Sequence, residues 1–278
     1  MRVSISSALV TLILGVIPAN GTVLRFATLI APLLNPFLAD WAALKHGLSA
    51  SDVTTLLVQT CLFAAFIFLP TVAQSVDRRC GSVMTIFIAR SLAPLLCILT
   101  DKTRSRRKFL LALLCFASTA ITLAPLNECS LPERIVNHTF GRAIGAQLLV
   151  LLSVVCFVTH AESEKAHGSM WIETAVIISA LSAPYSDLSA LVFQDVWVRF
   201  AVVLLLAWFS ARSLHNLKVL LEYSPLGVAF SLVQTQALSM LINAAGTPSM
   251  EMVALGSLIT FVVSYFGMRS NFVQRSEE

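Results

Sequence analysis

The stretch ILTDKTRSRRKFLLALLCFASTAITL, residues 98–123, changes abruptly in character halfway along. Residues 101–108 hold five of the 19 Lys and Arg residues of the chain, and after Lys108 no charged residue follows until Glu128. A basic block beside a long apolar run is typical of a cytoplasmic loop that precedes a transmembrane helix. This stretch therefore predicts a membrane protein.

The composition indicates a polytopic α-helical membrane protein. The chain is 57% hydrophobic and only 12% charged, with a mean hydropathy of +0.82. Soluble domains contain about half apolar and about a quarter charged residues. The net charge of +4 then reflects membrane topology rather than binding to nucleic acid. The basic block also fits a site for anionic lipid headgroups, and this alternative is left open.

Apolar runs of about 20 residues, the length that crosses a bilayer, recur along the chain. We predict ten transmembrane spans, at about 5–19, 23–43, 53–75, 82–100, 107–126, 142–160, 170–189, 196–215, 223–243 and 249–268. The first run is short and also fits a signal peptide cut after Ala19. We expect it to be retained, because another span follows at once.

The distribution of charge predicts that both termini are cytoplasmic. If every span crosses, the cytoplasmic side holds 12 Lys and Arg residues, the opposite side holds six, and Arg90 lies within a span. This bias agrees with the positive-inside rule. The sequons at Asn20 and Asn137 then face the lumen, which favours a Golgi or endoplasmic reticulum membrane.

The two halves of the chain resemble each other at an offset of about 144 residues. The segments that start at Ile86 and at Phe230 each contain a span, a polar break and a second span. Five spans per half place the halves in opposite orientations, an inverted repeat that is common in secondary transporters. We predict a first repeat at 1–126, an outer loop at 127–141, and a second repeat with a short cytoplasmic tail at 142–278.

Residues 222–272 resemble the C-terminal end of the drug/metabolite transporter superfamily. The resemblance rests on these residues: Ser224-Pro225, Gly246-Thr247-Pro248, Gly256, Tyr265-Phe266-Gly267 and Arg269. Residues 90–122 resemble the same unit in the first half, with Pro94 placed as in the nucleotide-sugar and triose-phosphate branches. The resemblance implies ten helices in two five-helix repeats, cytoplasmic termini and a central substrate site open alternately to each side.

The candidate substrate-binding residues are the polar groups inside predicted spans. Arg90 lies near the middle of the fourth span, where a charge costs about 2.5–3.5 kcal/mol and therefore faces a cavity or a partner. Its guanidinium suits a phosphate or carboxylate. Members of the nucleotide-sugar branch usually carry Lys in the fourth or ninth helix, and this chain has Arg90 in the fourth. We expect Arg90 to point into a central cavity, within reach of the ninth span.

The remaining candidates are Gln59, Tyr223, Gln234 and Gln236. The two glutamines of the ninth span are two residues apart and cannot share one helix face. One of them is expected to line the cavity while the other packs, and an interhelical hydrogen bond is the alternative for each. Tyr223 opens the ninth span and also fits an interfacial anchor.

The sequence shows no signature of an enzyme, a cofactor or a metal site. The six Cys residues are scattered, without the spacing of a metal site. His160 and His167 belong to the motif HAESEKAH, which we interpret as a solvated cytoplasmic loop. Cys80 and Cys129 lie on the same predicted outer side, where a disulfide forms if their Cα atoms lie within about 7 Å.

These patterns predict a transporter of an anionic or phosphorylated metabolite, with nucleotide-sugar antiport as one candidate activity. The expected partners are a small anionic solute and the lipid bilayer, without nucleic acid, and a homodimer is left open. The alternative is a multispan scaffold or complex-associated protein that does not transport. A polar cavity shared by the two halves distinguishes the first function from the second.

Overall fold

The computed structural model describes most of six predicted spans. The described residues are 50–100, 105–127, 140–164, 224–244 and 250–273, together with positions 201, 204, 205 and 208. The helices in these ranges are α4 (Ala50–Val76), α5 (Val83–Arg90), α6 (Ala93–Thr100), α7 (Arg106–Leu123), η1 (Ala124–Leu126), α9 (Phe140–Glu164), α12 (Pro225–Ala244) and α13 (Glu251–Val273). This part of the chain is all-helical, as the sequence predicts. The spans predicted at 5–19, 23–43 and 170–189 lie outside it, so the two-repeat arrangement stays a prediction.

Five helical segments of the described part are long and apolar enough to cross a membrane. They are Val83–Thr100, Arg106–Leu126, Phe140–Glu162, Pro225–Ile242 and Glu251–Ser270. Helix α4 contains a shorter apolar stretch, Cys61–Val76, which is not among these five segments. Exposed apolar side chains such as Leu110, Leu114 and Ile121 cover one face of α7. These features indicate an integral membrane protein.

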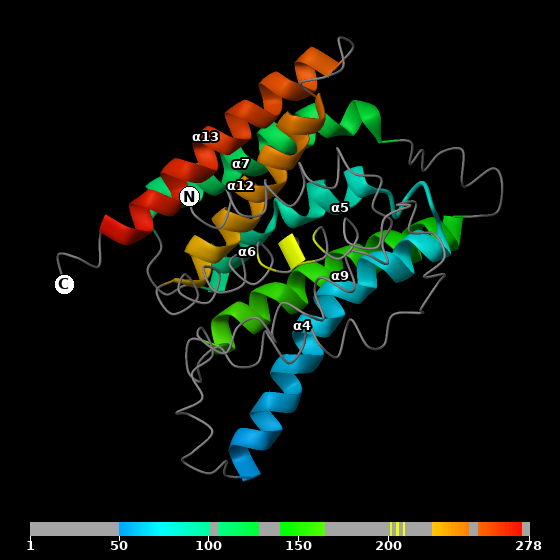
Figure 1. Ribbon diagram of the computed structural model, residues 1–278, viewed down its shortest axis with the longest axis vertical. Helices are drawn as coiled ribbons and strands as arrows, with labels where there is room; N and C mark the ends of the chain where they lie inside the picture. Colours follow the sequence, from blue (N-terminus) through cyan, green and yellow to red (C-terminus); the bar gives the residue numbers. More distant parts are fainter. Residues whose placement is uncertain are drawn as a thin grey trace.

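The helices form two groups that α5 and α6 connect (Figure 1). Helices α4 and α9 lie side by side in one group, and α7, α12 and α13 form the other. The α5–α6 segment contacts α9 on one side and α12 on the other. One hydrophobic core runs through both groups, from Phe66 and Phe157 to Phe230.

Contacts at the helix ends show which ends lie together. The Thr85 hydroxyl, at the start of α5, donates a hydrogen bond to Asn127 Oδ1 after η1, at 3.3 Å. At the opposite end, the Thr100 hydroxyl of α6 donates to the Glu162 carboxylate of α9. The α4–α5 loop therefore lies at one end of the α5–α6 segment, and the basic start of α7 lies at the other end. The predicted topology requires the same arrangement.

The tight loop between α4 and α5 is built from a few polar and small residues. The Asp77 carboxylate accepts hydrogen bonds from the backbone N–H groups of Arg79 and Cys80, at 3.0 and 3.1 Å. Gly81 lies directly on α4, where a Cβ atom would come within 2.5 Å of the Ala73 backbone. Ser82 then caps α5 by accepting the Thr85 N–H. Only glycine fits the close approach at position 81.

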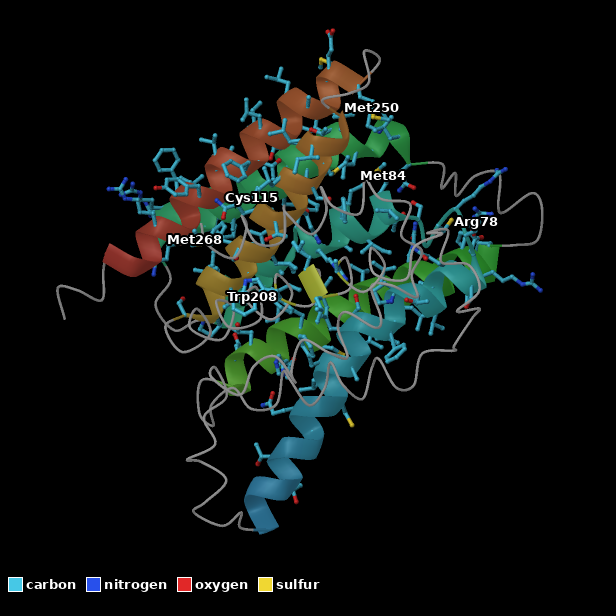
Figure 2. The ribbon with its side chains drawn as sticks, in the orientation of Figure 1. Arg78, Met84, Cys115, Trp208, Met250 and Met268 are labelled. Carbon is cyan, nitrogen blue, oxygen red and sulfur yellow. The ribbon has the colours of Figure 1, made fainter. Side chains whose placement is uncertain are left out.

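Small residues allow α7 and α13 to pack closely. A Cβ atom on Gly256 would lie 2.8 Å from Thr122 Cβ, and the Ser118 and Thr260 hydroxyls are hydrogen-bonded across the interface at 2.7 Å. Small side chains and hydroxyl pairs are the usual means by which membrane helices associate. At one end of this group, Met84 and Met250 pack against the same small hydrophobic cluster (Figure 2). Residues from the first and second halves of the chain thus share one interface.

Candidate functional site

Arg90 lies where the fourth predicted span is broken into two short helices. Helix α5 ends at Arg90 and α6 begins at Ala93. Pro94 has no N–H group, so it cannot donate to the Arg90 carbonyl in the regular helical pattern. The backbone forms a tighter turn instead, in which the Leu92 N–H donates to the carbonyl of Ala89, three residues earlier, at 3.0 Å. The break places the arginine at a helix end within the apolar span.

The guanidinium of Arg90 contacts an aromatic ring of α4. Its Cζ atom lies 4.7 Å from the centroid of the Phe66 ring. Arg90 Nε is buried and has no hydrogen-bond partner among the described residues. A cation over an aromatic face is attracted by the ring, but the ring offers no acceptor for an N–H group in the guanidinium plane. The site therefore leaves hydrogen-bonding capacity for a ligand.

An aromatic cluster between α4 and α9 surrounds Phe66. Its ring centroid lies 4.8 Å from that of Phe157 and 6.1 Å from that of Phe63, which in turn lies 5.1 Å from the His160 ring. Gln59 is 1% exposed and lies one helical turn before Phe63 on the same face of α4. The structure thus connects two predicted site residues, Gln59 and Arg90, through aromatic side chains that the sequence analysis did not select.

The placement of His160 in a solvated loop is wrong. Helix α9 continues to Glu164, beyond the predicted end of the sixth span at residue 160, and His160 is 1% exposed. The charged residues that follow it, Glu162 and Glu164, suggested a loop, but they belong to the last turn of the helix. Within the described ranges, no group of three His, Cys, Asp or Glu side chains is arranged to hold a metal ion.

The two glutamines of the ninth span have different surroundings. Both are buried in α12, with Gln234 fully enclosed and Gln236 8% exposed. Gln236 lines a small cavity together with hydroxyl side chains from α7 and α13, whereas Gln234 is not among the lining residues. The sequence prediction concerned a central cavity at Arg90, and Arg90 is not among the residues that line this one, so that prediction stays untested. Tyr223, the fifth candidate, lies outside the described residues.

The structure describes one of the two outer-side cysteines whose pairing was made conditional on a short Cα separation. Cys80 is disulfide-bonded, whereas Cys61, Cys97, Cys115 and Cys156 are free thiols. Cys129, the remaining cysteine of the six, lies outside the described residues. The pairing of Cys80 with Cys129 stays the prediction that accounts for these observations.

Comparison of the chain with models of protein families, with curated proteins and with solved structures finds no match. The site itself offers three features that bear on function: an arginine with a buried Nε at a broken membrane helix, an aromatic cluster beside it, and a separate polar cavity at Gln236.

Proposed function

We propose that the protein is a secondary transporter of an anionic or phosphorylated metabolite, with nucleotide sugars as one candidate class and exchange as one candidate mode. The observation that carries the proposal is Arg90, a cation within an apolar span that no described acidic residue neutralises. Charges inside membrane spans generally mark substrate or ion pathways. An arginine offers two parallel hydrogen bonds to a phosphate or a carboxylate.

The break in the fourth span supports the same function. Discontinuous membrane helices commonly form the substrate sites of secondary transporters, because their unpaired backbone groups and mobile junctions face the solute. Here the junction at Ser91–Leu92 directly follows Arg90. The same short segment thus supplies both the charge and the interruption. The resemblance of both halves to drug/metabolite transporters, stated from the sequence, agrees with this proposal.

The proposed location is a membrane of the secretory pathway, with cytoplasmic termini. The disulfide-bonded Cys80 lies in the α4–α5 loop, at one end of the span that contains Arg90. Disulfides persist in oxidising compartments such as the lumen of the endoplasmic reticulum. The basic residues Arg106, Arg107 and Lys108 lie beyond the opposite end, where the positive-inside rule places the cytoplasm. Two independent signals thus give one orientation.

Uptake by proteoliposomes, screened with a panel of nucleotide sugars and sugar phosphates, tests the proposal. Arg90→Ala should abolish uptake while membrane insertion stays intact, because the anion loses its cationic partner. Arg90→Lys keeps the charge without the two-pronged geometry, so part of the activity should remain. The matched control is Arg142→Ala, which removes an exposed arginine from the start of α9 and should leave uptake unchanged. Normal uptake by a well-inserted Arg90→Ala protein contradicts the proposal.

A scaffold without transport activity is the second candidate function, and one observation favours it. The cavity between α5, α7, α12 and α13 measures only about 10 Å³, so this interface between the halves is closely packed. A scaffold requires no space for a solute. If no member of the panel is taken up by correctly inserted protein, and none binds to it, the scaffold function is the one that remains.

A further inference from the structure

The cavity at Gln236 is polar although it lies inside an apolar helix bundle. It measures about 10 Å³ and is lined by residues of four helices, α5, α7, α12 and α13. Its polar lining consists of Thr119, Thr122, Gln236, Ser257 and Thr260. None of the described residues that line it is charged. A space of this size holds about one water-sized group, provided that two to four polar partners surround it.

The Gln236 amide supplies the donor of this site. The residue is 8% exposed, and its Nε2 atom is buried without a hydrogen-bond partner among the described residues. A buried N–H group without an acceptor is unfavourable, and native proteins nearly always provide one. The amide therefore indicates that an acceptor atom occupies the cavity beside it.

The surrounding hydroxyl groups supply acceptors. Thr119 donates its proton to the Cys115 carbonyl at 2.8 Å, and Thr122 donates to the Ser118 carbonyl at 2.6 Å. Each hydroxyl has one proton and two lone pairs, so these oxygens still accept hydrogen bonds. A group that suits this lining must both accept from the amide and donate to a threonine oxygen.

We propose that the cavity binds one uncharged hydroxyl group, coordinated by Gln236 and the threonines of α7. Water and an alcohol hydroxyl of a solute share this chemistry. A charged atom does not fit, because the site offers no countercharge and lies in a medium of low dielectric constant. Water fills the closed site, and a solute hydroxyl replaces it when the helices of the two halves part. The binding of a solute hydroxyl, unlike that of water, rests on the proposed transport function.

The first experiment tests the site without any transport. A cryo-electron microscopy structure of the full chain, at a resolution that shows ordered water, should contain one oxygen atom within hydrogen-bond distance of Gln236 Nε2. Gln236→Leu should lose that oxygen and lower the thermal unfolding midpoint, because the threonine oxygens lose their donor. Thr119→Val, a nearly isosteric change, should also lower the midpoint. The double variant with both changes should lower the midpoint by less than the sum of the two single effects.

The control variant is Met240→Leu, which alters an apolar part of the cavity wall. The Met240→Leu protein should retain the oxygen atom. Gln236→Leu should lower the unfolding midpoint by the same amount in this variant as in the wild-type protein. An empty cavity in the wild-type structure, combined with an unchanged or higher midpoint for Gln236→Leu, overturns the proposal. That result would mean that the Gln236 amide is unpaired in the wild-type protein, because the replacement of an unpaired buried amide by an apolar group of similar shape does not lower stability.

The second experiment identifies the source of the hydroxyl. Uptake of a transported sugar phosphate is compared with uptake of its deoxy analogues, in the wild-type protein and in Gln236→Leu. If a solute hydroxyl enters the site, the variant loses the wild-type preference for one hydroxyl position, by about tenfold or more. An unchanged preference assigns the site to water alone. If the protein transports nothing, the proposed function fails, while the first experiment still decides whether the site exists.

Discussion

Arg90 and Phe66 form a cation–π pair across two membrane helices, with 4.7 Å between the guanidinium carbon and the ring centroid. Phe66 is itself fixed by Phe157, whose ring lies 4.8 Å away. The pair holds the arginine head in the apolar span, where none of the described acidic residues pairs with it. An anion that approaches the guanidinium therefore does not have to displace a carboxylate, which favours reversible binding.

The pair predicts that Phe66 positions Arg90 for its ligand. Phe66→Leu keeps an apolar side chain but removes the ring, and a desolvated cation–π contact such as this one contributes about 2 kcal/mol. We expect the apparent affinity for the transported anion to fall about thirtyfold, while Arg90→Ala abolishes uptake. The control is Phe109→Leu, an exposed position on α7. Equal loss of affinity in both variants would show that the ring has no specific role.

The close contact of α7 and α13 predicts that Gly256 tolerates no side chain. Gly256→Ala forces a Cβ atom into Thr122, and overpacking of this kind costs about 1–3 kcal/mol. Gly145→Ala in α9 is the matched control, because a Cβ atom at that position meets nothing within 4 Å. Unfolding of the purified protein in detergent should show lower stability only for the first variant. The double variant Gly256→Ala with Thr122→Gly should recover part of the loss.

The helices themselves could be predicted from the sequence because bilayer thickness fixes the length of an apolar span. The prediction at 249–268 corresponds to α13 (Glu251–Val273), and that at 107–126 to α7 with η1. The break after Arg90 was not predicted, although Pro94 is its signal. A proline removes the N–H that would bond four residues back, and four residues before Pro94 is Arg90.

The partners of the candidate residues were harder to predict. Arg90 was expected to lie within reach of the ninth span, which stays a prediction because Tyr223 lies outside the described residues, whereas its contact with Phe66 of α4 was not predicted. Hydropathy places a residue along a span, but the rotation of each helix about its axis depends on packing against its neighbours. For the same reason, the sequence left open which of Gln234 and Gln236 lines a cavity.

The oxidised Cys80 predicts a specific cross-linked peptide. Digestion of the protein without reducing agent, followed by mass spectrometry, should yield a peptide that joins Cys80 to Cys129. A native disulfide commonly stabilises a protein by about 2–4 kcal/mol, so Cys80→Ser should lower the unfolding midpoint. Cys61→Ser, which removes an exposed free thiol, should leave the midpoint unchanged. Detection of a free thiol at Cys80 in protein from the native membrane would contradict this prediction.

The orientation can be tested with trypsin on sealed microsomes, whose outer face corresponds to the cytoplasm. Arg106 and Arg107 are exposed at the start of α7, and Arg78 and Arg79 are exposed in the α4–α5 loop. The proposed topology predicts cleavage after Arg106 or Arg107 in intact vesicles. Cleavage after Arg78 or Arg79 should require detergent, which opens the lumen to the protease. The reverse pattern would place the basic block in the lumen and invert the topology.

The hydrogen bond between Ser118 and Thr260 predicts measurable coupling between the two halves of the chain. The hydroxyls lie 2.7 Å apart, and each also lies within hydrogen-bond distance of a carbonyl of its own helix. Because each hydroxyl has one proton, the one that donates across the interface gives up its carbonyl, so the loss of the interhelical bond is partly compensated. Interhelical hydrogen bonds in membranes contribute about 0.6 kcal/mol on average. A double-mutant cycle with Ser118→Ala and Thr260→Val should therefore give a coupling energy of about 0.5–1 kcal/mol. The pair Ser75→Ala and Thr260→Val should show none, because the Ser75 hydroxyl bonds within α4. A coupling energy of zero for the first pair would mean that packing at Gly256, and not the hydroxyl contact, holds α7 against α13.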